Sequence, residues 1–233
     1  MTAIFKREFK AYFKSPIGYV ILAVYLLFLG LSFTTMYVSG YPYTSYIFSQ
    51  MFAIVLFSVP IITMRLMSED KRQKTDQALL TAPVSLSSIV MGKFLAAFAF
   101  FSLIFVETFI FQLIFLSYGT VDWPSYFGNV VGLALFAAAL IAVGLFVSSL
   151  TESQVIAAIC SFAISLALMM LDSIASMTNV AFINDIAKWV SFSGRYQTFT
   201  EGIFDFANVM FFVSFTALFL FFTVRVLEKK RYS

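Results

Sequence analysis

The stretch from Tyr126 to Leu150, YFGNVVGLALFAAALIAVGLFVSSL, contains no charged residue and exceeds the roughly 20 apolar residues that a helix needs to cross a bilayer. It therefore predicts a membrane-spanning helix. Its small residues, among them Gly132, Gly144 and Ser148, favour close packing against neighbouring helices. Working outward from it, we predict further spans at Gly18–Val38, Tyr46–Leu66, Ile89–Ser117, Gln154–Leu171 and Asp205–Val226.

The composition agrees with a chain that lies mostly in lipid. Hydrophobic residues make up 61% of the 233 residues, charged residues make up 12%, and the mean hydropathy is +0.93. A soluble domain carries about 25% charged residues. Six spans leave no room for a second folded domain. We therefore predict an all-α membrane protein with a single transmembrane domain over residues 1–233.

The positive charges are distributed unequally between the two sides of these spans. Only Lys188 and Arg195 fall on the side of the odd-numbered turns. All the other basic residues fall on the opposite side: Lys6, Arg7, Lys10, Lys14, Arg65, Lys71, Arg72, Lys74, Lys93, Arg225, Lys229, Lys230 and Arg231. Because basic loops stay in the cytoplasm, we expect a multi-pass protein of the plasma membrane with both termini cytoplasmic. The same charges would meet anionic membrane lipids, and they are too dispersed to indicate nucleic acid.

The sequence excludes several kinds of chemistry. It has no histidine, and its one cysteine, Cys160, lies in an apolar stretch. An HExxH zinc site, a Ser-His-Asp triad and an intrachain disulfide are therefore ruled out. The phosphate-binding pattern GxxxxGK[ST] is also missing, because Gly92-Lys93 is followed by Phe94 and lacks the earlier glycine. We expect a chain that is not an enzyme and holds no cofactor or metal, so that any energy it uses comes from a partner or a gradient.

Three segments outside the spans have patterns of their own. Residues 1–16 place Phe5, Phe9, Tyr12 and Phe13 on one helical face and basic residues on the other, which predicts a helix in the membrane surface; a disordered basic tail is the alternative. Residues 172–204 form a long outer segment, where we expect short helices that dip into the outer leaflet. The charged residues around this segment form either an outer gate or, as we favour, solvated charges at its boundaries: Asp172, Asp185, Arg195, Glu201 and Asp205.

The third segment is the charged inner loop at residues 67–88. From Met67 to Ser85 it reads MSEDKRQKTDQALLTAPVS, with good helix formers and neither glycine nor proline before Pro83. It predicts one short cytoplasmic helix with a charged first half and an exposed apolar tip that includes Leu79 and Leu80. Such a helix suits docking to another protein. A solvated connector between two spans is the equal alternative.

This loop resembles the loop between spans two and three of type-2 ABC exporter permeases, in their gliding-motility and copper-maturation-like branch. The resemblance rests on Glu69 to Ser85, which ends in LLTAPVS, and on the tail from Gly202 to Arg231. The overall order of helices is similar too. One departure is Lys74, where many relatives carry glycine before the threonine.

The resemblance implies a permease half that pairs with a second permease chain, as a homodimer or heterodimer. The inner loop would be a coupling helix that sits in a groove of a cytoplasmic ATPase subunit, and that subunit would bind ATP and magnesium. Carried over by position, the residues facing the ATPase are Glu69, Asp70, Lys71, Arg72, Thr75, Asp76, Gln77, Leu79 and Leu80. The substrate is not indicated.

Glu107 is a carboxylate within the third predicted span. A charge there costs about 2.5–3.5 kcal/mol on insertion scales, so the side chain should face the bundle interior, a cavity or a polar partner. It is either a contact for substrate or protons, or a structural hydrogen-bond acceptor.

Two rival functions stay open at this point: a gradient-driven carrier or channel without an ATPase, and a membrane anchor that only recruits a cytoplasmic partner.

Overall fold

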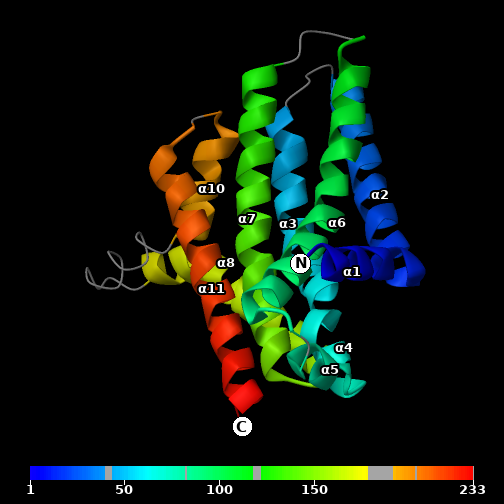
Figure 1. Ribbon diagram of the computed structural model, residues 1–233. Helices are drawn as coiled ribbons and strands as arrows, with labels where there is room; N and C mark the ends of the chain where they lie inside the picture. The colour runs from blue at the N-terminus through cyan, green and yellow to red at the C-terminus, as the bar shows by residue number, and fades with distance from the viewer. Residues whose placement is uncertain (40–43, 82, 118–121, 178–190, 203, 233) are drawn as a thin grey trace.

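The computed structural model describes residues 1–39, 44–81, 83–117, 122–177, 191–202 and 204–232 (Figure 1). These residues form helices joined by short turns, and no strand occurs among them. In chain order the helices are α1 (Thr2–Lys14), α2 (Pro16–Ser39), α3 (Thr44–Thr63), α4 (Arg65–Arg72), α5 (Thr75–Thr81), α6 (Leu86–Phe115), α7 (Trp123–Leu150), α8 (Gln154–Met177), α10 (Phe192–Thr200) and α11 (Phe206–Tyr232). The predicted all-α class is confirmed.

Within the described ranges, six helical stretches are long and apolar enough to cross a membrane. They are Pro16–Val38, Ser45–Arg72, Leu86–Phe115, Trp123–Leu150, Gln154–Leu171 and Phe206–Arg231. Each overlaps one span predicted from the sequence, so the chain is a multi-pass membrane protein. The second stretch combines α3 and α4, which are separated only at Met64.

Helix α7, from which the sequence argument began, is the centre of the bundle. It packs against α3, α6, α8, α10 and α11 (Figure 1). A Cβ atom at Gly144 would overlap the side chain of Thr63 in α3, and one at Gly132 would lie 2.6 Å from Cβ of Phe199 in α10. The small residues are therefore required where α7 meets its neighbours.

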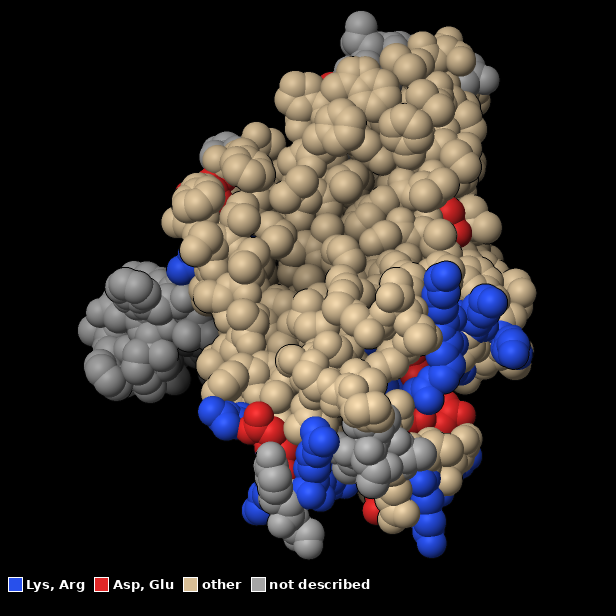
Figure 2. Space-filling model, viewed as in Figure 1, with Lys and Arg blue, Asp and Glu red and all other residues tan. Residues whose placement is uncertain are grey.

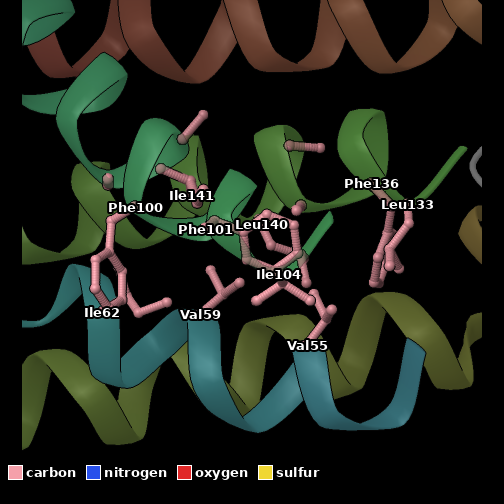
Figure 3. Packing of buried hydrophobic residues seen from close by; sticks show 14 of the residues in the cluster. Val55, Val59, Ile62, Phe100, Phe101, Ile104, Leu133, Phe136, Leu140 and Ile141 are labelled. Atoms are coloured by element: carbon pink, nitrogen blue, oxygen red, sulfur yellow. The ribbon is translucent and has the colours of Figure 1, made fainter. Parts of the chain in front are cut away.

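The apolar core lies between α3, α6 and α7. Figure 3 shows side chains from the three helices turned toward one another. All are buried: Val55, Val59 and Ile62 from α3, Phe100, Phe101 and Ile104 from α6, and Leu133, Phe136, Leu140 and Ile141 from α7. Branched and aromatic side chains thus interdigitate across the centre of the bundle, and this packing fixes α3, α6 and α7 relative to one another.

Most charged side chains on the face shown in Figure 2 gather at one end of the molecule, around α1, the α4–α5 region and the end of α11. Helix α1 lies across the long helices (Figure 1). It exposes Lys6, Lys10 and Lys14 and buries Tyr12. The helix predicted at residues 1–16 is therefore present as Thr2–Lys14, and its three lysines are exposed.

The long segment at residues 172–204 is described only in part. Helix α8 continues to Met177, and α10 packs on α7, whereas residues 178–190, within which further short helices were expected, lie outside the described residues. Arg195 in α10 is not a solvated boundary charge. Its Nη1 donates to Oδ1 of Asn208 in α11 at 2.8 Å, and its guanidinium lies 4.4 Å from the ring centroid of Phe211.

Candidate functional site

The charged inner loop forms two short helices rather than the single helix predicted. We call α4 and α5 together, Arg65–Thr81, the docking hairpin. Helix α4 ends where the N–H of Lys74 donates to the carbonyl of Lys71 at 3.0 Å, and Lys74 itself has φ of 56°. That left-handed conformation favours glycine. Lysine is a good helix former, so the sequence pattern concealed the break at this position.

Ser148 of α7 holds the beginning of α4. Its hydroxyl accepts hydrogen bonds from the N–H groups of Met67 at 3.1 Å and Ser68 at 3.0 Å, and it donates to the carbonyl of Met64 at 3.0 Å. N–H groups in the first turn of a helix have no acceptor in a preceding turn. Here a side chain from another span supplies one, so the hairpin begins at a fixed place on α7.

Lys71 is also turned toward α7. It is buried, and its Nζ donates to the carbonyl oxygen of Ser149. A cation at the carboxyl end of a helix satisfies carbonyls that lack an intrahelical partner and interacts favourably with the helix dipole. Lys71 therefore joins the hairpin to the carboxyl end of α7, and its ammonium group is not part of the exposed surface.

Asp70 lies in an ion-pair network that joins three elements. Its Oδ2 lies 2.6 Å from Nζ of Lys93 in α6 and 3.3 Å from Nη2 of Arg7 in α1, and its Oδ1 accepts a bond from Thr75 Oγ1 at 2.9 Å. Lys93 also pairs with Glu8 of α1 at 2.9 Å, and Glu8 pairs with Arg7 at 2.6 Å. The carboxylate of Asp70 thus joins α4 to α5 within the hairpin and connects the hairpin to α1 and α6.

Helix α1 has a second attachment close by. The hydroxyl of Tyr12 donates to the carbonyl of Ile62 in α3 at 3.0 Å, and the guanidinium of Arg65 lies 5.1 Å from the centroid of the Tyr12 ring. Burial raises the pKa of Tyr12 above its usual range, so the hydroxyl stays a neutral donor. Between α1 and the hairpin a polar cleft of about 230 Å³ remains.

The remaining predicted residues are more accessible. Arg72, Thr75 and Gln77 are exposed, and Glu69 and Asp76 are half-buried. The exposed set also includes Gln73 and Lys74. Glu69 lies 3.8 Å from Arg65 and accepts a bond from Gln73 at 3.2 Å, both pairs within the hairpin. These side chains form a polar surface at the charged end of the molecule.

The apolar tip of the hairpin is less exposed than the sequence suggested. Leu79 is half-buried and, with Ile89 of α6 and Leu227 of α11, lines a small pocket. The side chain of Leu80 lies outside the described part of the chain. Leu79 therefore packs the hairpin against the beginning of α6 and the end of α11.

Glu107 is half-buried in α6, and its Oε2 is buried with no hydrogen-bond partner among the described residues. That atom thus lacks the structural bond to serine or threonine that we had considered. An unsatisfied buried acceptor is costly, of order 1–3 kcal/mol. Glu107 lies far along α6 from Lys93, so it belongs to a different part of the molecule from the hairpin.

Sequence reasoning missed the residues that hold the hairpin in place. Ser148 was noted only as a small residue, and Lys93 only as one of many cytoplasmic cations. The available signal for Lys93 was its place between Gly92 and Phe94, inside the apolar stretch that became α6. A lysine there needs acceptors from neighbouring elements.

The described residues contain no group of His, Cys, Asp and Glu suited to a metal ion.

Comparison with known protein families identifies a match over most of the chain. The family described as "ABC-2 family transporter protein" matches residues 39–230, which include the docking hairpin and every span after the first. No match was found among curated proteins.

Proposed function

The chain belongs to the ABC-2 family of transporter membrane proteins, and on this premise we propose that it is the permease half of an exporter that docks on a separate cytoplasmic ATPase. ABC-2 permeases are the membrane components of ABC transporters, associate in general with an ATPase and are generally not the ATPase themselves. Beyond family membership, the proposal specifies the segment that docks on the ATPase, the pairing of two permease chains and the orientation in the membrane. The permease pairs with a second permease chain, both termini are in the cytoplasm, and the partner ATPase binds ATP and magnesium.

The observation that carries the proposal is the exposed polar surface of the docking hairpin. Arg72 at the end of α4 and Thr75 and Gln77 of α5 are exposed, and bonds from α6 and α7 hold α4 in place. A rigid, polar, protruding element suits docking into a groove of a partner. The same end of the molecule carries the basic residues of α1 and α11, which suits contact with anionic lipids of the inner leaflet.

Within the family, the resemblance of Glu69–Ser85 and of Gly202–Arg231 supports the gliding-motility and copper-maturation-like branch. Two permease halves would enclose the translocation path. Glu107 is our candidate for a polar contact along it, because its Oε2 is buried and accepts no hydrogen bond within the described ranges.

The docking proposal is tested by purification from native membranes in mild detergent. A P-loop ATPase is expected to co-purify with the chain and to be lost with Arg72→Glu combined with Gln77→Asp, both exposed on the hairpin. Lys229→Glu, exposed near the end of α11, is the control, and it should retain the ATPase. Absence of any ATPase, or equal loss with the control, contradicts the proposal.

The orientation is tested by labelling. Cys160 is the only cysteine, so Cys160→Ala gives a cysteine-free chain into which Lys74→Cys can be introduced at an exposed position. A membrane-impermeant maleimide should label Lys74→Cys in inside-out vesicles and not in intact cells. Labelling of intact cells would place the hairpin outside and refute the docking proposal.

A further inference from the structure

At the level of the docking hairpin, the helices pack as two groups. Helix α1 packs mainly on α6: the rings of Tyr12 and Phe100 stack with centroids 4.6 Å apart, and a Cβ atom at Gly92 would lie 3.1 Å from Cγ2 of Ile4. Helix α4 packs mainly on α7 and α8. A displacement of the hairpin would therefore reach α7 directly. Beyond the pocket that Leu79 shares with Ile89 and the contact of Arg65 with Tyr12, the hairpin is connected to α6 and α1 by ion pairs.

The side chain of Lys93 makes that connection. It begins in α6, is 1% exposed, and its Nζ lies 2.6 Å from Asp70 Oδ2, 2.9 Å from Glu8 Oε1 and 2.5 Å from the carbonyl oxygen of Leu66. An ammonium group has three protons to donate. Here the three acceptors come from α4 twice and from α1 once, so the cation is fixed between the hairpin and the surface helix.

We propose that Lys93 is the positioning residue that transmits movement of the docking hairpin to α6 and to α1, so that the membrane-surface helix moves together with the hairpin. This inference rests on the proposed function, in which an ATPase moves the hairpin. It adds to that function a mechanical role for α1, a helix that itself lies outside the family match at residues 39–230.

The physical argument is the cost of separating the charges. Lys93, Asp70 and Glu8 are largely shielded from solvent, with side-chain exposures of 1%, 17% and 12%. If the hairpin moved without α6, a buried cation and carboxylate would lose their partners, which is strongly unfavourable in a low dielectric. Arg7 supplies a parallel connection from α1 to Asp70. An ionic link resists relative displacement in every direction, whereas apolar surfaces can slide.

The test measures the distance between α1 and the hairpin by double electron–electron resonance in lipid nanodiscs. Spin labels are attached to Lys10→Cys and Gln73→Cys, both exposed, in the Cys160→Ala background. The parent chain should give one narrow distance distribution. Lys93→Met should broaden it, and Lys229→Met, which removes an exposed cation, should not. Glu8→Gln is the second variant, because it weakens only the α1 side of the link and provides the same readout if Lys93→Met fails to fold.

A second measurement uses the complex with the co-purified ATPase. In the parent complex the α1–hairpin distance should be the same with and without ATP plus vanadate, because the two elements move together. In Lys93→Met the distance should become nucleotide-dependent while ATPase binding is retained, a result that loss of stability alone would not produce. An unchanged, narrow and nucleotide-independent distance in both variants overturns the inference. If no ATPase binds the parent chain, the proposed function fails instead, and the broadening measured on the chain alone still decides whether Lys93 holds α1 to the hairpin.

Discussion

Ser148→Ala is the most direct perturbation of the docking hairpin, because it removes a single oxygen atom from α7. That oxygen accepts hydrogen bonds from the N–H groups of Met67 and Ser68 at the beginning of α4, at 3.1 and 3.0 Å. All three residues are buried, so water cannot replace the lost acceptor. The expected effect is local loosening of α4 rather than loss of the whole bundle.

The magnitude follows from the atoms that lose a partner. A buried donor left without an acceptor costs about 1–3 kcal/mol, and removing a side chain that caps a helix costs about 0.5–2 kcal/mol. We therefore expect Ser148→Ala to lower the free energy of opening α4 by about 1–3 kcal/mol. Amide hydrogen exchange in Arg65–Arg72 should accelerate by about fivefold to 140-fold, since 1.4 kcal/mol corresponds to a factor of ten.

The neighbouring residue provides a matched control. Ser149 is also buried, but its hydroxyl donates only to the carbonyl of Phe146 within α7, at 2.6 Å, and the atom that Lys71 uses is the backbone carbonyl. Ser149→Ala should therefore cost less than about 1 kcal/mol and leave exchange in α4 unchanged. Hydrogen exchange with mass spectrometry on both variants in nanodiscs gives the comparison. Equal exchange rates in α4 for the two variants would refute the capping role of Ser148.

Other substitutions test other parts of the structure. Lys74→Gly should raise the free energy of unfolding by about 1 kcal/mol, because it relieves a left-handed residue, whereas Lys74→Ala should not; SDS-induced unfolding in mixed micelles measures both. Gly132→Ala should destabilise the contact of α7 with Phe199 by about 1–3 kcal/mol in the same assay, and Gly128→Ala, whose Cβ would lie 3.4 Å from the Phe199 carbonyl oxygen, should cost less. Glu107→Gln should leave assembly intact on gel filtration, because Oε2 has no hydrogen bond to lose among the described residues, and should alter substrate stimulation of ATP hydrolysis in the complex.

The spans could be predicted from the sequence because lipid imposes a simple requirement on it. Each crossing needs about 20 apolar residues, and the basic residues flanking the spans indicate which ends lie together. The sequence also indicated where α7 packs closely, since Gly132 and Gly144 are small for a reason that the structure makes visible. The positions of the spans and the close packing of α7 both follow from the residue types within one segment, which can be read directly from a single sequence.

The internal organisation of the hairpin could not be predicted in the same way. Lys74 is a good helix former, so the local pattern favoured continuous helix, and only the backbone conformation shows the break. The partners of Asp70 and Lys71 lie on α6, α1 and α7, far away in the chain. A run of charged residues usually forms a solvent-exposed face of a helix. Nothing in the local sequence showed that Asp70 and Lys71 would instead be shielded from solvent by contacts with distant helices.

The contacts of Asp70 and Lys71 also narrow the surface that a partner can use. Consecutive residues of a helix point about 100° apart, so these two neighbours direct one side of α4 toward α6 and α1 and an adjacent side toward α7. The positions left are Glu69, Arg72 and Gln73, which share a face because they are three and four residues apart. A partner that grips this face would pull on a helix whose other sides are bound to three different elements. Under the proposed function, movement of the hairpin by the ATPase would then reach α1, α6 and α7 together at the charged end of the bundle.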